Sequence, residues 1–294
     1  MRKKILKSLV VILVITITSG MFVSCSFGAN NSAYEGENIT ISGSSALLPL
    51  MEQSIEKFNE SNPNDIINAQ AGGSGTGLTQ VLEGTADIGN SDVFAESKLT
   101  KEQSKKLVDH KVVAQGFGVV VNKDSNIENL TKKQIQDIFS GKLKNFKEIG
   151  GKDLEILVIH RPASSGSRET FVEKVLNGNK NLENDSIGIV QDSNGAVLNT
   201  IKQNEGAISY IALSYMTNKE AKESLGLVKI DGKEATSQNI KLDKYSFWSW
   251  GHMYTKGEAK GLSKRFIDFI DSKENAENVD SLGLIRGSEI KSNR

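Results

Sequence analysis

The sequence is poor in the residues that build covalent and metal centres. Its 294 residues include a single cysteine, Cys25, and three histidines. One thiol cannot form a disulfide within its own chain, so a disulfide framework is excluded. The histidines, His110, His160 and His252, form no cluster with cysteines and lie in no recognisable nucleophile motif. We therefore expect no metal, no other cofactor and no enzymatic activity.

The sequence also lacks an excess of charge of either sign. It carries 36 Lys+Arg and 36 Asp+Glu, and four of the basic residues stand within residues 1–24. Without that segment the chain has 32 basic and 36 acidic residues, a formal charge of −4. Proteins that bind nucleic acid need a basic field, so we expect no nucleic-acid partner. An anionic ligand would have to be captured by local hydrogen bonds.

The most apolar stretch, residues 9–17, is too short for a comfortable membrane span. It follows a basic start without acidic residues and precedes the small residues Ser19, Gly20 and Ser24. This order is typical of a secretory signal peptide, which we place at residues 1–24. An uncleaved membrane anchor is the alternative.

Cys25 follows Phe22, Val23 and Ser24, a run that resembles a bacterial lipobox. Such signals are cut before the cysteine, which is then lipidated. The alternative is a free thiol. Residues 25–37 are then the lipidated cysteine and a polar, flexible tether. We therefore expect the chain on the extracytoplasmic face of the cell membrane, held by its acyl chains.

Short apolar segments alternate with amphipathic ones along the rest of the chain. Residues 154–160 are almost entirely apolar, as expected of a strand that is buried on both faces. The alternation predicts an α/β fold with a largely parallel sheet and helices on both faces. The expected strands are residues 38–42, 66–71, 86–89, 111–114, 118–122, 154–160, 207–212 and 227–230, and the expected helices are residues 47–62, 77–82, 101–108, 132–139, 168–176 and 262–270.

Two α/β lobes, with the chain crossing between them twice, are the expected organisation. The candidate crossings lie near residues 114–117 and 245–250. The first lobe then comprises residues 38–115 together with residues 248–294. The second lobe comprises residues 116–247.

Four loops, each expected to join a strand to a helix, share one composition. They are rich in glycine and serine and lie at residues 42–46, 72–77, 89–92 and 161–168. Free N–H groups point out of a helix N-terminus, where the helix dipole is positive, and serine adds an O–H donor. Any one such loop is more simply a helix cap. Several together indicate an anion-binding site.

Two charged residues in these loops refine the prediction. Arg161 directly follows the apolar strand 154–160, at the strand edge where α/β sheets bind ligands. Its planar guanidinium suits an oxyanion, although an ion pair is an equally good reading of an isolated arginine. Asp92 is a carboxylate among anion-seeking donors. An ionised carboxylate only accepts hydrogen bonds. It would therefore accept one from an oxyanion that still carries a proton, and it would disfavour sulfate, which has no proton to donate.

The loop motifs together resemble those of a known family. The runs SGSSALLPL, AGGSGTGL, ADIGNSDVF and RPASSGSRETF, followed by YSFWSWGHMYTKG and FIDFI, occur here in that order. The chain is similar in this respect to the phosphate-binding lipoproteins of bacterial high-affinity phosphate ABC transporters. The resemblance covers residues 38–287. It implies a two-lobed, type II periplasmic-binding-protein fold that closes over one inorganic phosphate in the cleft between its lobes.

By motif position the resemblance also implies the site and the partners. Some members of the family carry an acidic residue just after the arginine; Pro162 and Ala163 stand there in this chain, which leaves open what orients Arg161. The partners would be two permease chains with an ATPase, and the binding protein would be a monomer. The implied phosphate ligands are Ser45, the Ala46 backbone N–H, Ser74, Asp92, Arg161, Ser165, Gly166 and Ser167, with Ser44 and Arg168 as possible further contacts.

Three other functions compete with phosphate delivery. The first is binding of another oxyanion, such as sulfate or molybdate, or of an organic phosphate. The second is a serine-dependent hydrolase or phosphatase, which the abundant serines invite but which needs a positioned base. The third is an adhesin or structural surface protein, in which Phe247, Trp248 and Trp250 would form an exposed aromatic patch that adheres to a partner.

Overall fold

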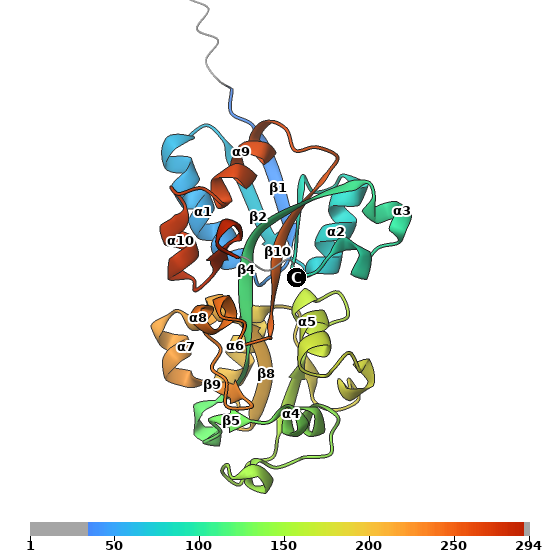
Figure 1. Cartoon of the computed structure of the whole chain (residues 1–294), viewed down its shortest axis with the longest axis vertical. Coiled ribbons are helices and arrows are strands. Elements are labelled where there is room, and N and C mark those ends of the chain that lie inside the picture. Colours follow the sequence, from blue (N-terminus) through green and yellow to red (C-terminus); the bar gives the residue numbers. More distant parts are fainter. Residues whose placement is uncertain (1–34, 291–294) are drawn as a thin grey trace, which may run out of the picture. The chain divides into compact units, whose positions relative to one another are not determined.

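Two long strands that lie side by side, β4 (Leu107–Asn122) and β10 (Trp248–Lys256), organise the structure (Figure 1). The structure is a computed structural model and describes residues 35–290. By internal contacts the chain divides into two units, residues 1–35 and 36–294. The predicted signal peptide, Cys25 and most of the predicted tether lie outside the described residues.

The sheet has eleven strands, with the order β2-β1-β3-β10-β4-β8-β6-β7 along its main path. β10 pairs antiparallel with both β3 and β4, and β4 pairs antiparallel with β8 and β9. The flanking pairs β1–β2, β1–β3, β6–β7 and β6–β8 are parallel. The predicted α/β alternation is confirmed, but a largely parallel sheet is wrong at its centre.

One group of elements packs around the parallel strands β1 (Asn38–Gly43), β2 (Ile66–Ala71) and β3 (Ile88–Ser91), and we call it the β1 side. Its core combines strand residues such as Ile41 with apolar faces of helices from both ends of the chain, for example Leu50 and Phe266. Its helices are α1 (Leu48–Ser61), α2 (Ser74–Glu83), α3 (Lys101–Ser104), α9 (Gly261–Ile270) and α10 (Ala276–Ser281); the short strand β11 (Ile285–Arg286) pairs with β4.

The other group packs around β6 (Leu157–His160), β7 (Ile189–Val190) and β8 (Ala207–Ala212), and we call it the β6 side. Its core is aromatic: Phe171 stacks on Tyr210 with ring centroids 4.1 Å apart. The remaining strands are β5 (Asn129–Leu130) and β9 (Leu225–Ile230), and the helices are α4 (Lys132–Phe139), α5 (Gly166–Lys174), α6 (Asn194–Gln203), α7 (Lys219–Ser224) and α8 (Ser237–Lys241).

The expected elements around residues 101–122 need correction. The structure has a four-residue helix, α3, and then one continuous strand, where we expected a helix over 101–108 and two separate strands. Residues 112–122 of this strand are buried without interruption. Two-sided burial removes the alternation of polar and apolar residues that marks a strand's length. The sequence prediction also missed β10 and α6.

Candidate functional site

The turn after β1 is tied to the turn after β3. Gly43 has φ +137°, and a Cβ there would collide with the Asn90 carbonyl oxygen, so only glycine fits this approach. The Ser44 N–H donates to the same carbonyl at 2.9 Å. The Ser44 hydroxyl donates to Asp92 and accepts the Ala46 N–H at 3.0 Å. The expected Ala46 donor is therefore used within this turn.

Asp92 lies at the centre of the assembled loops and is 2% exposed. Besides Ser44, its carboxylate accepts the Gln115 side-chain amide at 2.7 Å and the Ser167 hydroxyl at 3.3 Å. Its own N–H donates to the Ser74 hydroxyl oxygen at 2.9 Å. Burial raises the pKa of the Asp92 carboxyl above its ordinary value, and these donors and a nearby guanidinium only partly oppose that rise.

Arg161 reaches the same place from the end of β6 and is 1% exposed. Its Nε donates to the Gln191 carbonyl at 3.0 Å, and Nη2 donates to the Asp192 carbonyl at 3.0 Å and to the Ser45 hydroxyl at 3.3 Å. Main-chain carbonyls therefore orient this arginine, which answers the question left by Pro162. Nη1 is buried and has no hydrogen-bond partner among the described residues. Burial lowers the pKa of the guanidinium from its ordinary value.

The N-terminus of α5 faces Asp92. The Ser165 hydroxyl caps this helix by accepting the Arg168 N–H at 3.2 Å. The N–H groups of Gly166 and Ser167 have no acceptor among the described residues, as expected at a helix N-terminus. A Cβ on Gly166 would lie 2.7 Å from the Asp92 Cβ and would overlap the Ser74 hydroxyl. The α5 and α2 N-termini therefore approach each other across Asp92.

Arg168 is the one expected residue whose side chain the structure directs elsewhere. Its guanidinium makes two hydrogen bonds to Asp185, at 2.8 and 2.9 Å. Nη1 also donates to the Arg161 carbonyl at 2.5 Å. Arg168 therefore holds the main chain at the end of β6, whereas we expected it as a possible contact to the ligand.

Several contacts join the β1 side to the β6 side around this cluster. The Gly75 N–H donates to the Ser164 carbonyl at 2.9 Å. Lys98 Nζ donates to the Ala163 carbonyl at 2.9 Å and to Glu169 Oε2 at 3.0 Å, and we call this pair of contacts the Lys98 latch. The structure thus holds the two sides closed on each other.

Sequence reasoning missed four contributors to the cluster. Gln115 lies inside β4, and the carbonyls of Gln191 and Asp192 are main-chain groups, so none of them has a motif. Asn194, the first residue of α6, donates to the Ser45 hydroxyl oxygen through both its backbone and its side chain. The SNG run at residues 193–195 was a weak signal for a helix cap there.

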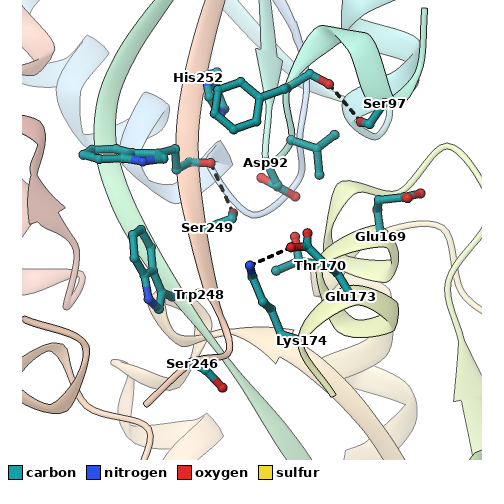
Figure 2. A pocket seen from close by; sticks show the side chains of 13 residues that line it. Asp92, Ser97, Glu169, Thr170, Glu173, Lys174, Ser246, Trp248, Ser249 and His252 are labelled. Carbon is teal, nitrogen blue, oxygen red and sulfur yellow. Dashed lines mark hydrogen bonds and ion pairs between the residues drawn. The ribbon is translucent and has the colours of Figure 1, made fainter. Parts of the chain in front are cut away.

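A cavity of about 300 Å³ opens beside Asp92. Figure 2 shows Asp92 above Glu169, Thr170 and Lys174 of α5, with Trp248 of β10 on the opposite wall. Among the lining residues, Asp92 is the one that also belongs to the polar cluster. The residues expected from the sequence to bind the anion, Asp92 excepted, therefore lie beside this cavity and do not line it.

The cluster as a whole is built to donate hydrogen bonds. Within the described residues, the hydroxyl hydrogens of Ser45, Ser74 and Ser165 have no acceptor, and two N–H groups of α5 and Arg161 Nη1 are equally unpaired. Unpaired buried donors of this number indicate a ligand that accepts hydrogen bonds on several sides. No group of three or more metal-ligating side chains occurs in the described part of the chain.

Comparisons with known proteins agree on one family. A family model for the PBP superfamily domain matches residues 28–274. The phosphate-binding protein PstS of Bacillus subtilis (strain 168) is 43% identical over 272 residues, 90% of this chain and 88% of that protein. PstS of Borreliella burgdorferi is 25% identical over 282 residues, 94% of this chain and 98% of that protein.

Solved structures give the same picture. One, from Clostridium perfringens, is described as a phosphate ABC transporter substrate-binding protein with bound phosphate; it is 33% identical, with a TM-score of 0.76, over 85% of this chain and 99% of its own. An ABC-type phosphate transport receptor from Vibrio cholerae is 26% identical, with a TM-score of 0.63, over 85% and 99% of the two chains.

Proposed function

Because the chain belongs to the phosphate-binding protein (PstS) family of the PBP superfamily, we propose that it binds inorganic phosphate and delivers it to an ABC-type importer. Its fold is the two-lobed type II fold expected from the sequence. The observation that carries the proposal is the buried Nη1 of Arg161, which has no hydrogen-bond partner among the described residues, on a guanidinium whose Nη2 contacts the Ser45 hydroxyl. A buried donor without an acceptor is costly, and an oxyanion would supply that acceptor.

The proposed ligands come from both sides of the cleft. Ser45 and Ser74 donate from the β1 side, where Ser44 and Ala46 support the turn. From the β6 side the donors are Arg161, Ser165, Gly166 and Ser167. Such a shell of neutral donors with one guanidinium suits a compact tetrahedral anion.

Asp92 supplies the proposed selectivity. Its carboxylate accepts bonds from Gln115 and Ser167 and can accept one more from a phosphate that carries a proton. Sulfate has no proton to offer near neutral pH, so it would place like charge against Asp92. The geometry therefore favours phosphate over sulfate and molybdate.

Closure is the proposed signal to the importer. We take residues 38–115 and 248–294 as one lobe and residues 116–247 as the other. Contacts between the lobes, such as the Lys98 latch, exist only when the cleft is closed. A ligand that bridges both lobes stabilises that state by the contacts it adds there. The closed protein would be recognised by two permease chains that work with an ATPase.

The cellular setting is proposed from the N-terminal sequence. Cleavage after residue 24 and lipidation of Cys25 would hold the chain, as a monomer, on the extracytoplasmic face of the membrane. No helix in residues 35–290 is long and apolar enough to cross a bilayer.

We propose that the chain binds its ligand without catalysing a reaction. Within residues 35–290 the rings of His110, His160 and His252 hydrogen-bond Thr255, Glu183 and Asp109, and no hydrogen bond joins any of these rings to a serine. A hydrolase needs such a pair. The histidine contacts therefore support a binding protein.

Calorimetric titration with phosphate, sulfate and molybdate, run beside an assay with p-nitrophenyl phosphate, tests this function. We expect one phosphate per chain, sulfate binding at least about 100-fold weaker, and no turnover. Equal affinity for sulfate would refute the role of Asp92. Release of p-nitrophenol by the pure protein would make the chain an enzyme.

A further inference from the structure

Asn194 joins the two lobes at the anion cluster. It is the first residue of α6, is completely buried, and belongs to the β6 side. Its backbone N–H and its side-chain Nδ2 both donate to the Ser45 hydroxyl oxygen, at 3.1 and 2.9 Å. Its Oδ1 accepts the Ala212 N–H at 3.0 Å. Because Ala212 fixes the oxygen end of the amide, the nitrogen end must face Ser45.

These contacts decide which way the Ser45 hydroxyl can point. A serine oxygen has two lone pairs and one hydrogen. Three N–H donors converge on this oxygen, two from Asn194 and one from Arg161 Nη2 at 3.3 Å. They occupy the acceptor side, so the hydrogen is directed away from them, and it has no acceptor among the described residues.

We propose that Asn194 is a positioning residue that makes Ser45 a donor to the bound anion and that forms this contact only when the lobes close. The inference rests on the proposed function, because the anion it serves is phosphate. The sequence around this residue signals a helix cap and no role in binding. It would couple closure of the second lobe to the hydrogen-bonding state of the first.

An isosteric exchange, Asn194→Asp, tests the direction of the hydrogen bond. Aspartate can still accept the Ala212 N–H, but its second oxygen would accept the Ser45 hydroxyl hydrogen and turn it away from phosphate. The new charge would also repel the anion. We expect the phosphate Kd at pH 8 to rise about 100-fold relative to the unchanged protein.

The pH profile separates this role from a structural one. At lower pH the new carboxyl becomes protonated and can donate to Ser45 again. The ratio of the variant and unchanged Kd values, measured at each pH between 8 and 5, should therefore fall towards one. A merely structural defect would leave that ratio constant. Asn278→Asp, on α10, is the matched control, because the Asn278 Nδ2 also donates a hydrogen bond, to the Gln53 carbonyl, and lies outside the cluster. The ratio for this control should stay near one.

A double-mutant cycle decides the matter if Asn194→Asp does not fold. Asn194→Ala and Ser45→Ala should each weaken phosphate binding about 10-fold, and the double variant should be no weaker than Ser45→Ala alone. Additive losses would overturn the inference, and so would an Asn194→Asp protein with unchanged affinity. Absence of phosphate binding by the unchanged protein would instead refute the proposed function.

Discussion

Replacing Arg161 by methionine is the sharpest single perturbation of the site. Methionine fills a similar apolar volume but has no charge and no donor. The change removes the Nη1 group, which has no partner among residues 35–290, together with the bonds to the carbonyls of Gln191 and Asp192. It therefore separates what the guanidinium does for the ligand from what it does for the fold.

The expected loss of affinity follows from the burial of this group, which is 1% exposed. Truncating one partner of a buried, hydrogen-bonded charge pair costs about 2–5 kcal/mol. Since about 1.4 kcal/mol is a factor of ten, the phosphate Kd should rise by about 30- to 4,000-fold. In the unliganded protein the carbonyls of Gln191 and Asp192 lose their donors, which lowers stability by about 1–3 kcal/mol for each carbonyl. The substitution also removes a buried cation, whose desolvation costs several kcal/mol on folding. These opposing terms should leave the free energy of unfolding little changed.

Calorimetry and urea unfolding of the unliganded protein measure the two effects. Arg286→Met is the control, because Arg286 pairs with Glu289 at a partly exposed position of the β1 side. It should leave the phosphate Kd unchanged. A loss of stability as large as the loss of affinity in Arg161→Met would refute the assignment, since the arginine would then be a structural residue. An unchanged Kd would remove it from the site.

Three further changes test other parts of the account. In Asp92→Asn the discrimination against sulfate should fall by at least about tenfold, as calorimetry would measure. Because burial raises the pKa of folded Asp92, the contribution of this carboxyl to the stability of the unliganded protein falls as pH rises from 3.8 through the folded pKa. Urea unfolding should therefore show Asp92→Asn gaining stability relative to the unchanged protein between pH 3.5 and pH 7. A shift the other way would contradict the raised pKa. Lys98→Met, which breaks the Lys98 latch, should raise the phosphate Kd by about 3- to 10-fold, because phosphate is released faster; stopped-flow measures that rate. The control is Lys264→Met, which removes an exposed ion pair within a helix. Equal effects of the two changes would count against the latch. Gly166→Ala should weaken phosphate binding at least about tenfold, because the added Cβ obstructs closure of the lobes. Gly195→Ala is the control and should bind normally, since its added Cβ would lie 3.8 Å from its nearest atom. Tight binding by Gly166→Ala would mean that the lobes close differently.

The sequence predicted the parts of the site that lie in short local motifs. Serines and glycines before a helix have a physical role that can be recognised locally, so the loops around Ser45, Ser74 and Ser165 could be named in advance. Arg161 and Asp92 were found because charge stands out among such residues. The assignment of these residues as phosphate ligands stays a prediction.

Contacts between distant segments could not be predicted in this way. Asn194 meets Ser45 across 149 positions of the chain, and its sequence surroundings mark only a helix cap. The two carbonyls that orient Arg161 belong to the main chain, which has no sequence signature. Arg168 was given a possible ligand role, but its actual partner, Asp185, lies in an irregular loop that no sequence pattern marks.

The fold was limited by the same difficulty. Alternating apolar and amphipathic segments indicate strands and helices, but not which strands pair or in which direction. β10 returns antiparallel between β3 and β4, and its WSWGHMY run has no regular alternation. The pairing at the centre of the sheet therefore became visible only in three dimensions.

A crystal structure of the protein grown with arsenate would test the central claim most directly, because arsenic scatters anomalously and arsenate carries protons like phosphate. We predict a single anomalous peak per chain, within hydrogen-bonding reach of Arg161 Nη1 and the Ser45 hydroxyl, with one arsenate oxygen against Asp92. A peak in the aromatic-lined cavity beside Trp248, or on surface lysines alone, would contradict the account.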